Sequence, residues 1–84
     1  MTLTSQSRLQ TIIKENDYPY IGAKLRDARY EAGYTLVDIS KILGVTRMQV
    51  INYEKGNQLT TWMLLALSQF YNKPVSYFLP EQYQ

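Results

Sequence analysis

Apolar residues recur at a helical spacing in the middle of the chain, between residues 34 and 56. One face of an α-helix consists of positions i, i+3, i+4 and i+7, and here these positions hold Leu36, Ile39, Ser40 and Leu43. The small side chain of Ser40 is expected where a second helix comes close. The pattern predicts a short amphipathic helix.

Both ends of this helix carry capping residues. Thr35 precedes the helix as its N-cap and Asp38 follows three residues later, which is the capping-box arrangement. Gly44 ends the helix, because glycine adopts a left-handed backbone without a side-chain clash. Thr46 then serves as the N-cap of a second helix, with Gln49 at its third position. Two short helices joined by a glycine turn are the outline of a helix-turn-helix.

The second helix has an inner and an outer side. Val50 and Tyr53 are predicted to point inward together with Val45. The outer side then holds Arg47, Met48, Ile51 and Asn52.

Two further helices are predicted upstream. The nearer one runs from Tyr20 to a C-terminal cap at Gly33, and its inward positions are Ile21, Leu25, Ala28 and Ala32. The farther one lies between residues 5 and 15 and ends at Asn16, Asp17 and Pro19; its apolar face holds Leu9, Ile12 and Ile13. A helix this short is unstable alone in water, so it either packs on the domain or on a second copy, or is a frayed leader.

Downstream, Thr60 is predicted to cap an apolar helix, and residues 75–79 to form a last turn that folds back before Pro80 and buries Val75, Phe78 and Leu79. The capped helix is more apolar than one buried face requires. The excess residues are either part of a small bundle's core or a dimer contact, and they are Trp62, Met63 and Leu65.

Composition excludes several classes of protein. A chain of 84 residues suffices for one domain, and no stretch approaches the roughly 18 apolar residues of a membrane span. The first 20 residues lack the pattern of a secretion signal, so we expect a cytoplasmic protein. Cysteine and histidine are both absent, which removes disulfides, thiolate metal sites and the usual proton shuttle. An enzyme is therefore disfavoured, and no metal or cofactor is expected.

The net charge of +2 neither demands nor forbids a nucleic-acid partner. The nine basic residues are dispersed along the chain and form no polybasic tail. Any DNA binding would therefore depend on a folded surface.

Three segments resemble the phage-repressor family of helix-turn-helix proteins, the Cro/cI-like group: IGAKLRDAR, TLVDISKILGVTRMQVINYEKG and LSQFYNKPVSYFLP. The resemblance covers residues 21–80. It implies an all-α, lambda-repressor-like bundle of five short helices, with the residues before 21 as an extension that holds the additional short helix, and residues 81–84 as a tail. It also implies that the core includes Leu64, Leu67, Ser68 and Tyr71.

The resemblance further implies that the second helix of the motif reads the major groove of DNA through Arg47, Met48 and Asn52. A guanidinium can bond guanine O6 and N7, an amide can pair with adenine, and the methionine would meet a thymine methyl or a neighbouring side chain. Ile51 stands where the family more often has a small polar residue, and it would contribute a methyl contact at most.

Backbone or secondary contacts are expected from residues flanking this helix: Thr35, Lys41, Thr46, Gln49, Ile51, Lys55, Asn57 and Thr60. The amides at the start of the first motif helix, near Thr35, form a natural anion site. Two alternatives remain, because Gln49 is also explained as part of a capping box, and Lys55 and Asn57 as ordinary loop residues. Leu36 replaces a family glutamine that braces a phosphate.

The resemblance also pairs Arg29 with Glu54, at the end of the second motif helix. Such an ion pair would have a structural role, because it ties the first domain helix to the reading helix. Independent, solvated charges are the alternative.

These expectations define two functions. The first is a sequence-specific DNA-binding transcriptional regulator, a repressor, that binds a double-stranded operator as a homodimer. Its dimer face would be the extension around Leu9, Ile12 and Ile13, or Trp62 with Tyr77 and Phe78. The second is a protein-interaction module, such as an antitoxin or anti-repressor partner, whose apolar contact surface holds Val37, Ile42, Met48 and Ile51.

Overall fold

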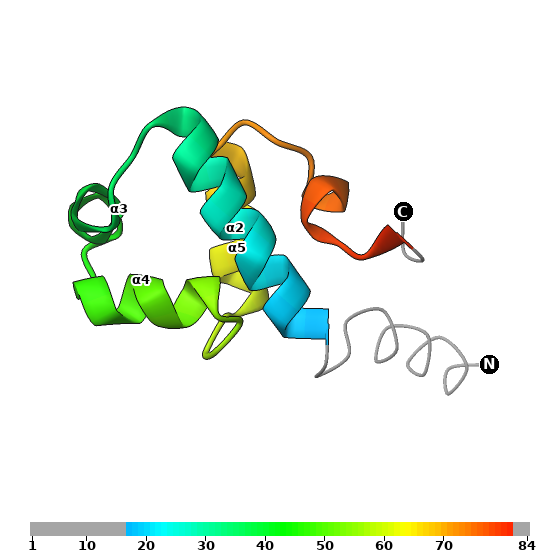
Figure 1. Ribbon diagram of the computed structural model, residues 1–84, viewed down its shortest axis with the longest axis horizontal. Coiled ribbons are helices and arrows are strands. Elements are labelled where there is room, and N and C mark those ends of the chain that lie inside the picture. Colours follow the sequence, from blue (N-terminus) through cyan, green and yellow to red (C-terminus); the bar gives the residue numbers. More distant parts are fainter. Residues whose placement is uncertain (1–16, 82–84) are drawn as a thin grey trace.

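The computed structural model describes residues 17–81 (Figure 1). In chain order it contains α2 (Tyr18–Ala32), α3 (Leu36–Leu43), α4 (Arg47–Glu54), α5 (Thr61–Phe70) and the 3-10 helix η2 (Val75–Phe78). This confirms the all-α expectation for the described range, which contains no strand. The last of the five expected helices is a 3-10 turn. The short helix expected around Leu9, Ile12 and Ile13 lies outside the described residues.

The helices are arranged around α2. It crosses in front of α5, with α3 and α4 to one side and η2 to the other (Figure 1). None of the helices between residues 17 and 81 combines the length and the apolar character needed to cross a bilayer.

Helix α2 begins earlier than its sequence pattern predicts. It starts at Tyr18 and includes Pro19 in its first turn, where a break was expected. Proline is compatible with this position because its ring fixes a helical φ, and the amide it lacks would have no partner inside the helix. Gly33 ends the helix with a φ of 82°, as expected of a C-terminal cap.

The hydrophobic core lies where α2, α4, α5 and η2 meet. Ile21 and Leu25 of α2 belong to one buried cluster with Phe78 of η2, and each of these side chains is at most 1% exposed. The core is completed by Ala28, Tyr53, Leu59, Leu64 and Leu67. Burial of such side chains contributes roughly 1.5–3 kcal/mol each to the free energy of folding.

Some positions differ from the expected core. Ala32 is exposed, because the last turn of α2 extends beyond the core and all residues from Tyr30 to Gly33 reach the surface. Tyr71, Val75 and Leu79 are only half-buried. Phe78 is fully buried, so it is wrong as a member of an exposed dimer face.

Candidate nucleic-acid interface

Helix α4 is anchored by one side and capped at its start. Val50 is 2% exposed and Tyr53 7% exposed, as the inward pattern predicted. The Thr46 hydroxyl accepts a hydrogen bond of 3.1 Å from the backbone amide of Gln49. A cap of this kind satisfies one of the amides that a helix start leaves without an internal partner, and is worth about 1 kcal/mol.

The opposite side of α4 reaches the surface. Arg47 and Met48 are exposed, Met48 to 59%, while Ile51 and Asn52 are half-buried. The side chains expected to read bases are therefore on the outer side of one helix and are not covered by the core. A helix of this kind is about 10–12 Å wide, which matches the width of the major groove.

The capping box predicted at the start of α4 is only half formed. The bond at Thr46 uses the backbone amide of Gln49, and no return bond from the Gln49 side chain is present within residues 17–81. A complete box requires both bonds. The Gln49 side chain is half-buried.

The start of α3 has a complete capping box, with a consequence for phosphate binding. Thr35 accepts a 3.0 Å bond from the amide of Asp38, and the Asp38 carboxylate accepts a 2.9 Å bond from the amide of Thr35. These bonds lower the pKa of the Asp38 carboxyl, the backbone bond most. The Thr35 amide is therefore occupied by a negative group of the chain itself. The first-turn amides of Leu36 and Val37 have no intrahelical partner and could face an acceptor.

The other flanking residues are dispersed. Lys41 is exposed in the last turn of α3, and Lys55 and Asn57 are exposed in the turn that follows α4. The hydroxyl of Thr60 accepts a 3.1 Å bond from the amide of Met63, so it caps α5. Lys55 and Asn57 lie next to α4, whereas Thr60 already has a structural partner.

Arg29 and Glu54 form a nearly buried ion pair. Arg29 Nε donates to Glu54 Oε2 at 2.7 Å and Nη2 donates to Oε1 at 3.0 Å, and the two side chains are 6% and 10% exposed. Nη1 donates to the carbonyl oxygen of Tyr34 at 3.0 Å. The hydrogen bond to Glu54 is the main cause that raises the pKa of the Arg29 guanidinium. One side chain thus connects α2, the loop before α3 and the end of α4.

Two shallow hollows lie beside this ion pair and share Arg29, Tyr30 and Leu36. The larger, about 520 Å³, reaches the start of α4 at Arg47. The smaller, about 220 Å³, reaches the end of α4 and is lined also by Arg26, Ile51, Glu54 and Lys55.

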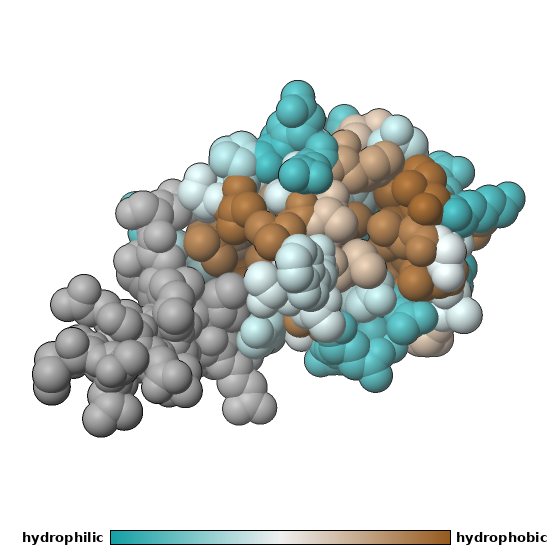
Figure 2. Space-filling model, turned by 180° about the vertical axis from the view of Figure 1, so that it is seen from behind, coloured by the Kyte–Doolittle hydropathy of each residue, from teal (hydrophilic) through white to brown (hydrophobic). Residues whose placement is uncertain are grey.

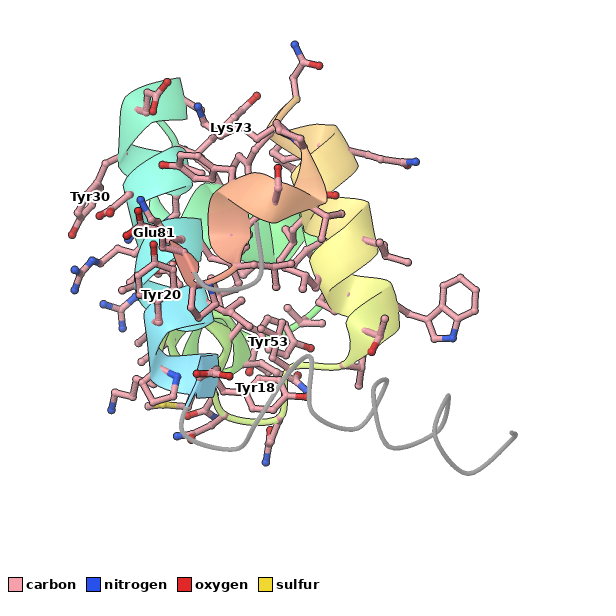
Figure 3. The ribbon with its side chains drawn as sticks, turned by 90° about the vertical axis from the view of Figure 1, so that its right-hand side faces the viewer. Tyr18, Tyr20, Tyr30, Tyr53, Lys73 and Glu81 are labelled. Carbon is pink, nitrogen blue, oxygen red and sulfur yellow. The ribbon has the colours of Figure 1, made fainter. Side chains whose placement is uncertain are left out.

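Tyr30 and Arg26 were not among the site residues predicted from sequence. Tyr30 is 64% exposed, projects from α2 (Figure 3), and lies 4.6 Å from the Arg29 guanidinium, ring centre to carbon. Arg26 is exposed one helical turn before Arg29. That spacing was the available signal, since residues three apart share a helix face.

The chain carries no group of histidine, cysteine, aspartate or glutamate residues, anywhere from 17 to 81, that could hold a metal ion. The exposed side chains on and beside α4 include the cations Arg47 and Lys55, the amide of Asn57 and the apolar Met48.

Comparisons with known sequences agree on one family. The family model described as Helix-turn-helix matches residues 25–78. An uncharacterized HTH-type transcriptional regulator of Sinorhizobium medicae is 33% identical over 63 residues, which is 74% of this chain and 45% of that protein. An HTH-type transcriptional regulatory protein of Pyrococcus abyssi is 42% identical over 40 residues, or 13% of its own length. This chain spans less than half the length of these relatives.

Solved structures show the same fold. The crystal structure of the DNA-binding domain of BldD has a TM-score of 0.69 and 30% sequence identity, and the match covers 81% of this chain and 100% of that chain. The crystal structure of apo-HppE has a TM-score of 0.68 at 20% identity, covering 76% of this chain and 36% of that chain. The second likeness is one of fold alone.

Proposed function

This chain belongs to the Cro/cI-like helix-turn-helix family of DNA-binding domains, and from this premise we propose that it regulates transcription by binding a specific DNA sequence. The observation that carries the proposal is the outer side of α4. This helix is held on its inner side by Val50 and Tyr53 and at its end by the Arg29 to Glu54 ion pair, and its opposite side is open. A helix held in this way, with an uncovered side that carries both polar and apolar side chains, is suited to the major groove.

Individual roles follow from the side chains. Arg47 donates its planar fork to guanine O6 and N7, and Asn52 pairs with adenine through its amide. Met48, 59% exposed, contacts a thymine methyl, and Ile51 adds a second apolar contact. Gln49, without a capping bond from its side chain, is a further polar contact. Lys55, Asn57 and Lys41 bind the DNA backbone, with less from the start of α3, where Asp38 adds negative charge.

The protein acts as a homodimer on a two-part operator and represses by occupying it. A single domain of this size buries little surface on DNA, and two-fold proteins read half-sites about one helical turn apart. Of the dimer face considered from sequence, Phe78 is buried, but Trp62 of α5 is 81% exposed and Leu65 38%. Helix α5 faces the viewer in Figure 2, where hydrophobic side chains reach the surface between polar ones. We assign the dimer contact to Trp62 and Leu65.

Enrichment of bound duplexes from a random library tests base reading. Arg47→Ala and Asn52→Ala should each lose discrimination at one base pair of the enriched operator, by about 1–3 kcal/mol per bidentate contact. Two matched controls are Lys73→Ala, which removes a charge beside η2, and Gln69→Ala, which removes an exposed amide on α5. Unchanged discrimination in Arg47→Ala and Asn52→Ala, with folding intact, would refute the assignment of α4 as the reader.

A second candidate is a protein-interaction module that uses the same surface. It is supported by three exposed apolar side chains on α3 and α4: Val37 at 44%, Ile42 at 49% and Met48 at 59%. The dependence of binding affinity on salt concentration distinguishes the two functions. Affinity for DNA falls steeply as salt rises, because phosphate contacts release counterions, whereas an apolar protein contact changes little.

A further inference from the structure

We infer that Arg26 of α2 and Lys55, just after α4, together bind a backbone phosphate of the DNA in the smaller of the two hollows. The inference rests on the proposed function and adds Arg26, which was not among the predicted site residues, to the backbone contact already expected of Lys55. Its basis is the convergence of two cations from segments 29 residues apart on one hollow of about 220 Å³.

The charge of the hollow is uncompensated. Its lining contains three cations, Arg26, Arg29 and Lys55, and one carboxylate, Glu54. Glu54 is already bound to Arg29 by two hydrogen bonds. Both ion pairs found among residues 17–81 involve other cations, Arg29 and Lys73. Arg26 and Lys55 therefore contribute two positive charges that no carboxylate of the described chain neutralises.

The location favours phosphate over a base edge. The hollow adjoins Ile51, on the outer side of α4, but it lies beside the helix, between α2 and the α4 end. When a helix fills the major groove, the sugar-phosphate strands that border the groove lie against its flanks. A guanidinium fork matches the geometry of phosphate oxygens, and an ammonium adds a point charge.

The start of α3 is a poorer anion site in this chain. The Thr35 amide there is bonded to the Asp38 carboxylate, which carries a negative charge at neutral pH as an ordinary aspartate does. An incoming phosphate would meet a like charge at that helix start, whereas the hollow at Arg26 and Lys55 offers net positive charge. Backbone anchoring is therefore expected to depend on the hollow.

The test measures the affinity of the full chain for two duplexes, an enriched operator and a scrambled sequence of equal length, across salt concentrations. Arg26→Gln and Lys55→Gln each remove one charge, Arg26→Lys keeps it, and Lys73→Gln is the matched control on the other side of α2, where Lys73 lies over the Tyr77 ring of η2. Thermal melting of every variant reports whether folding is intact, which is expected because Arg26 and Lys55 are exposed.

Arg26→Gln and Lys55→Gln should each weaken binding of the operator and of the scrambled duplex by the same factor. Each should also make the slope of log affinity against log salt shallower by up to about 0.9. The resulting loss of affinity is then up to about 3.5-fold larger at about 50 mM salt than at about 200 mM. Arg26→Lys should keep the slope of the unmodified chain. If Arg26→Gln matches Lys73→Gln, or if it changes the preference between the duplexes, the inference is wrong. If the unmodified chain binds neither duplex, the proposed function itself fails, and the inference fails with it.

Discussion

Gly22 of α2 lies so close to the turn after α4 that a Cβ atom on it would come to 2.5 Å from the backbone nitrogen of Gly56. Gly56 has a φ of 83°, and a Cβ atom there would collide with the carbonyl of Tyr18. The start of α2 and the end of α4 thus pack backbone against backbone. This contact and the Arg29 to Glu54 ion pair together fix the direction in which α4 leaves the core.

Gly22→Ala should destabilise the protein. In an unconstrained helix interior, alanine is more favourable than glycine by about 1 kcal/mol. Here the added methyl group meets backbone atoms of Glu54 and Gly56, which cannot rotate away as a side chain can. We expect a net loss of about 1–3 kcal/mol, measured by thermal or denaturant unfolding. Asp27→Ala, on the exposed side of the same helix, is the control and should stay within about 0.5 kcal/mol; a more stable Gly22→Ala variant would contradict the close contact.

The two ion pairs of the described chain should differ in their contributions to stability. Glu54→Ala leaves the nearly buried Arg29 charge without its partner and should cost about 3 kcal/mol, lowering the melting temperature by more than about 10 °C. Glu31→Ala removes the partner of Lys73 at a site where the glutamate side chain is 64% exposed, and should cost less than about 1 kcal/mol. Equal melting temperatures for the two variants would mean that the Arg29 pair has no special structural role.

Asp38 should make the free energy of unfolding depend on pH in the acid range. Its hydrogen bonds with Thr35 lower the pKa of its carboxyl in the folded protein below the ordinary value of 3.8. A lowered folded pKa stabilises the protein above the unfolded pKa, and this stabilisation is lost as pH falls through the folded pKa. Asp38→Asn should therefore melt at a lower temperature at pH 7, and the difference from the unmodified chain should shrink below about pH 4.

Asp27→Asn is the control for that titration, because the Asp27 carboxylate is exposed and accepts no hydrogen bond from the residues the structure describes. Its melting curve should follow the unmodified chain at both pH values. A difference at pH 7 for Asp38→Asn that persisted unchanged in acid would exclude the carboxylate as its source.

If Trp62 forms the dimer contact, Trp62→Ala should weaken dimerisation without affecting the folding of the single chain. The side chain is 81% exposed in the single chain, so its removal should change the melting temperature of the monomer little. A central aromatic contact is commonly worth 2 kcal/mol or more, so the dimer dissociation constant should rise by at least about 30-fold. Sedimentation or light scattering across concentrations measures it, with Tyr30→Ala as an exposed aromatic control; dimerisation unaffected by Trp62→Ala would place the contact elsewhere.

Local signals predicted the helix-turn-helix well. Thr35 with Asp38, Gly44, Thr46 and Thr60 all act as helix caps in the structure. These are short-range effects, because an N-cap depends on backbone amides within the next turn, and the C-cap at Gly44 on a left-handed backbone and a carbonyl of the preceding turn. The same reasoning failed at Pro19, where one residue is compatible with both a helix end and a helix start, and at Gln49, where the second bond of the box did not form.

Contacts between distant segments were the harder part. The hollow that joins Arg26 to Lys55 could not be inferred from either segment alone, because it depends on how α2 crosses α4. The exposure of Ala32 could not be predicted for the same reason. Its spacing from Ala28 fits the buried face of the helix, but the sequence does not show that the core ends before the last turn.

The sequence by itself determined the helices, their caps and the outer side of α4, since each follows from interactions within about one helical turn. Tertiary structure alone decided how near α2 comes to α4, which cations remain without a carboxylate, and that Phe78 belongs to the interior. Those outcomes depend on side chains and backbone brought together from distant segments, as where Arg26 and Lys55, 29 residues apart, line one hollow, and spacing along a chain carries no record of such distances.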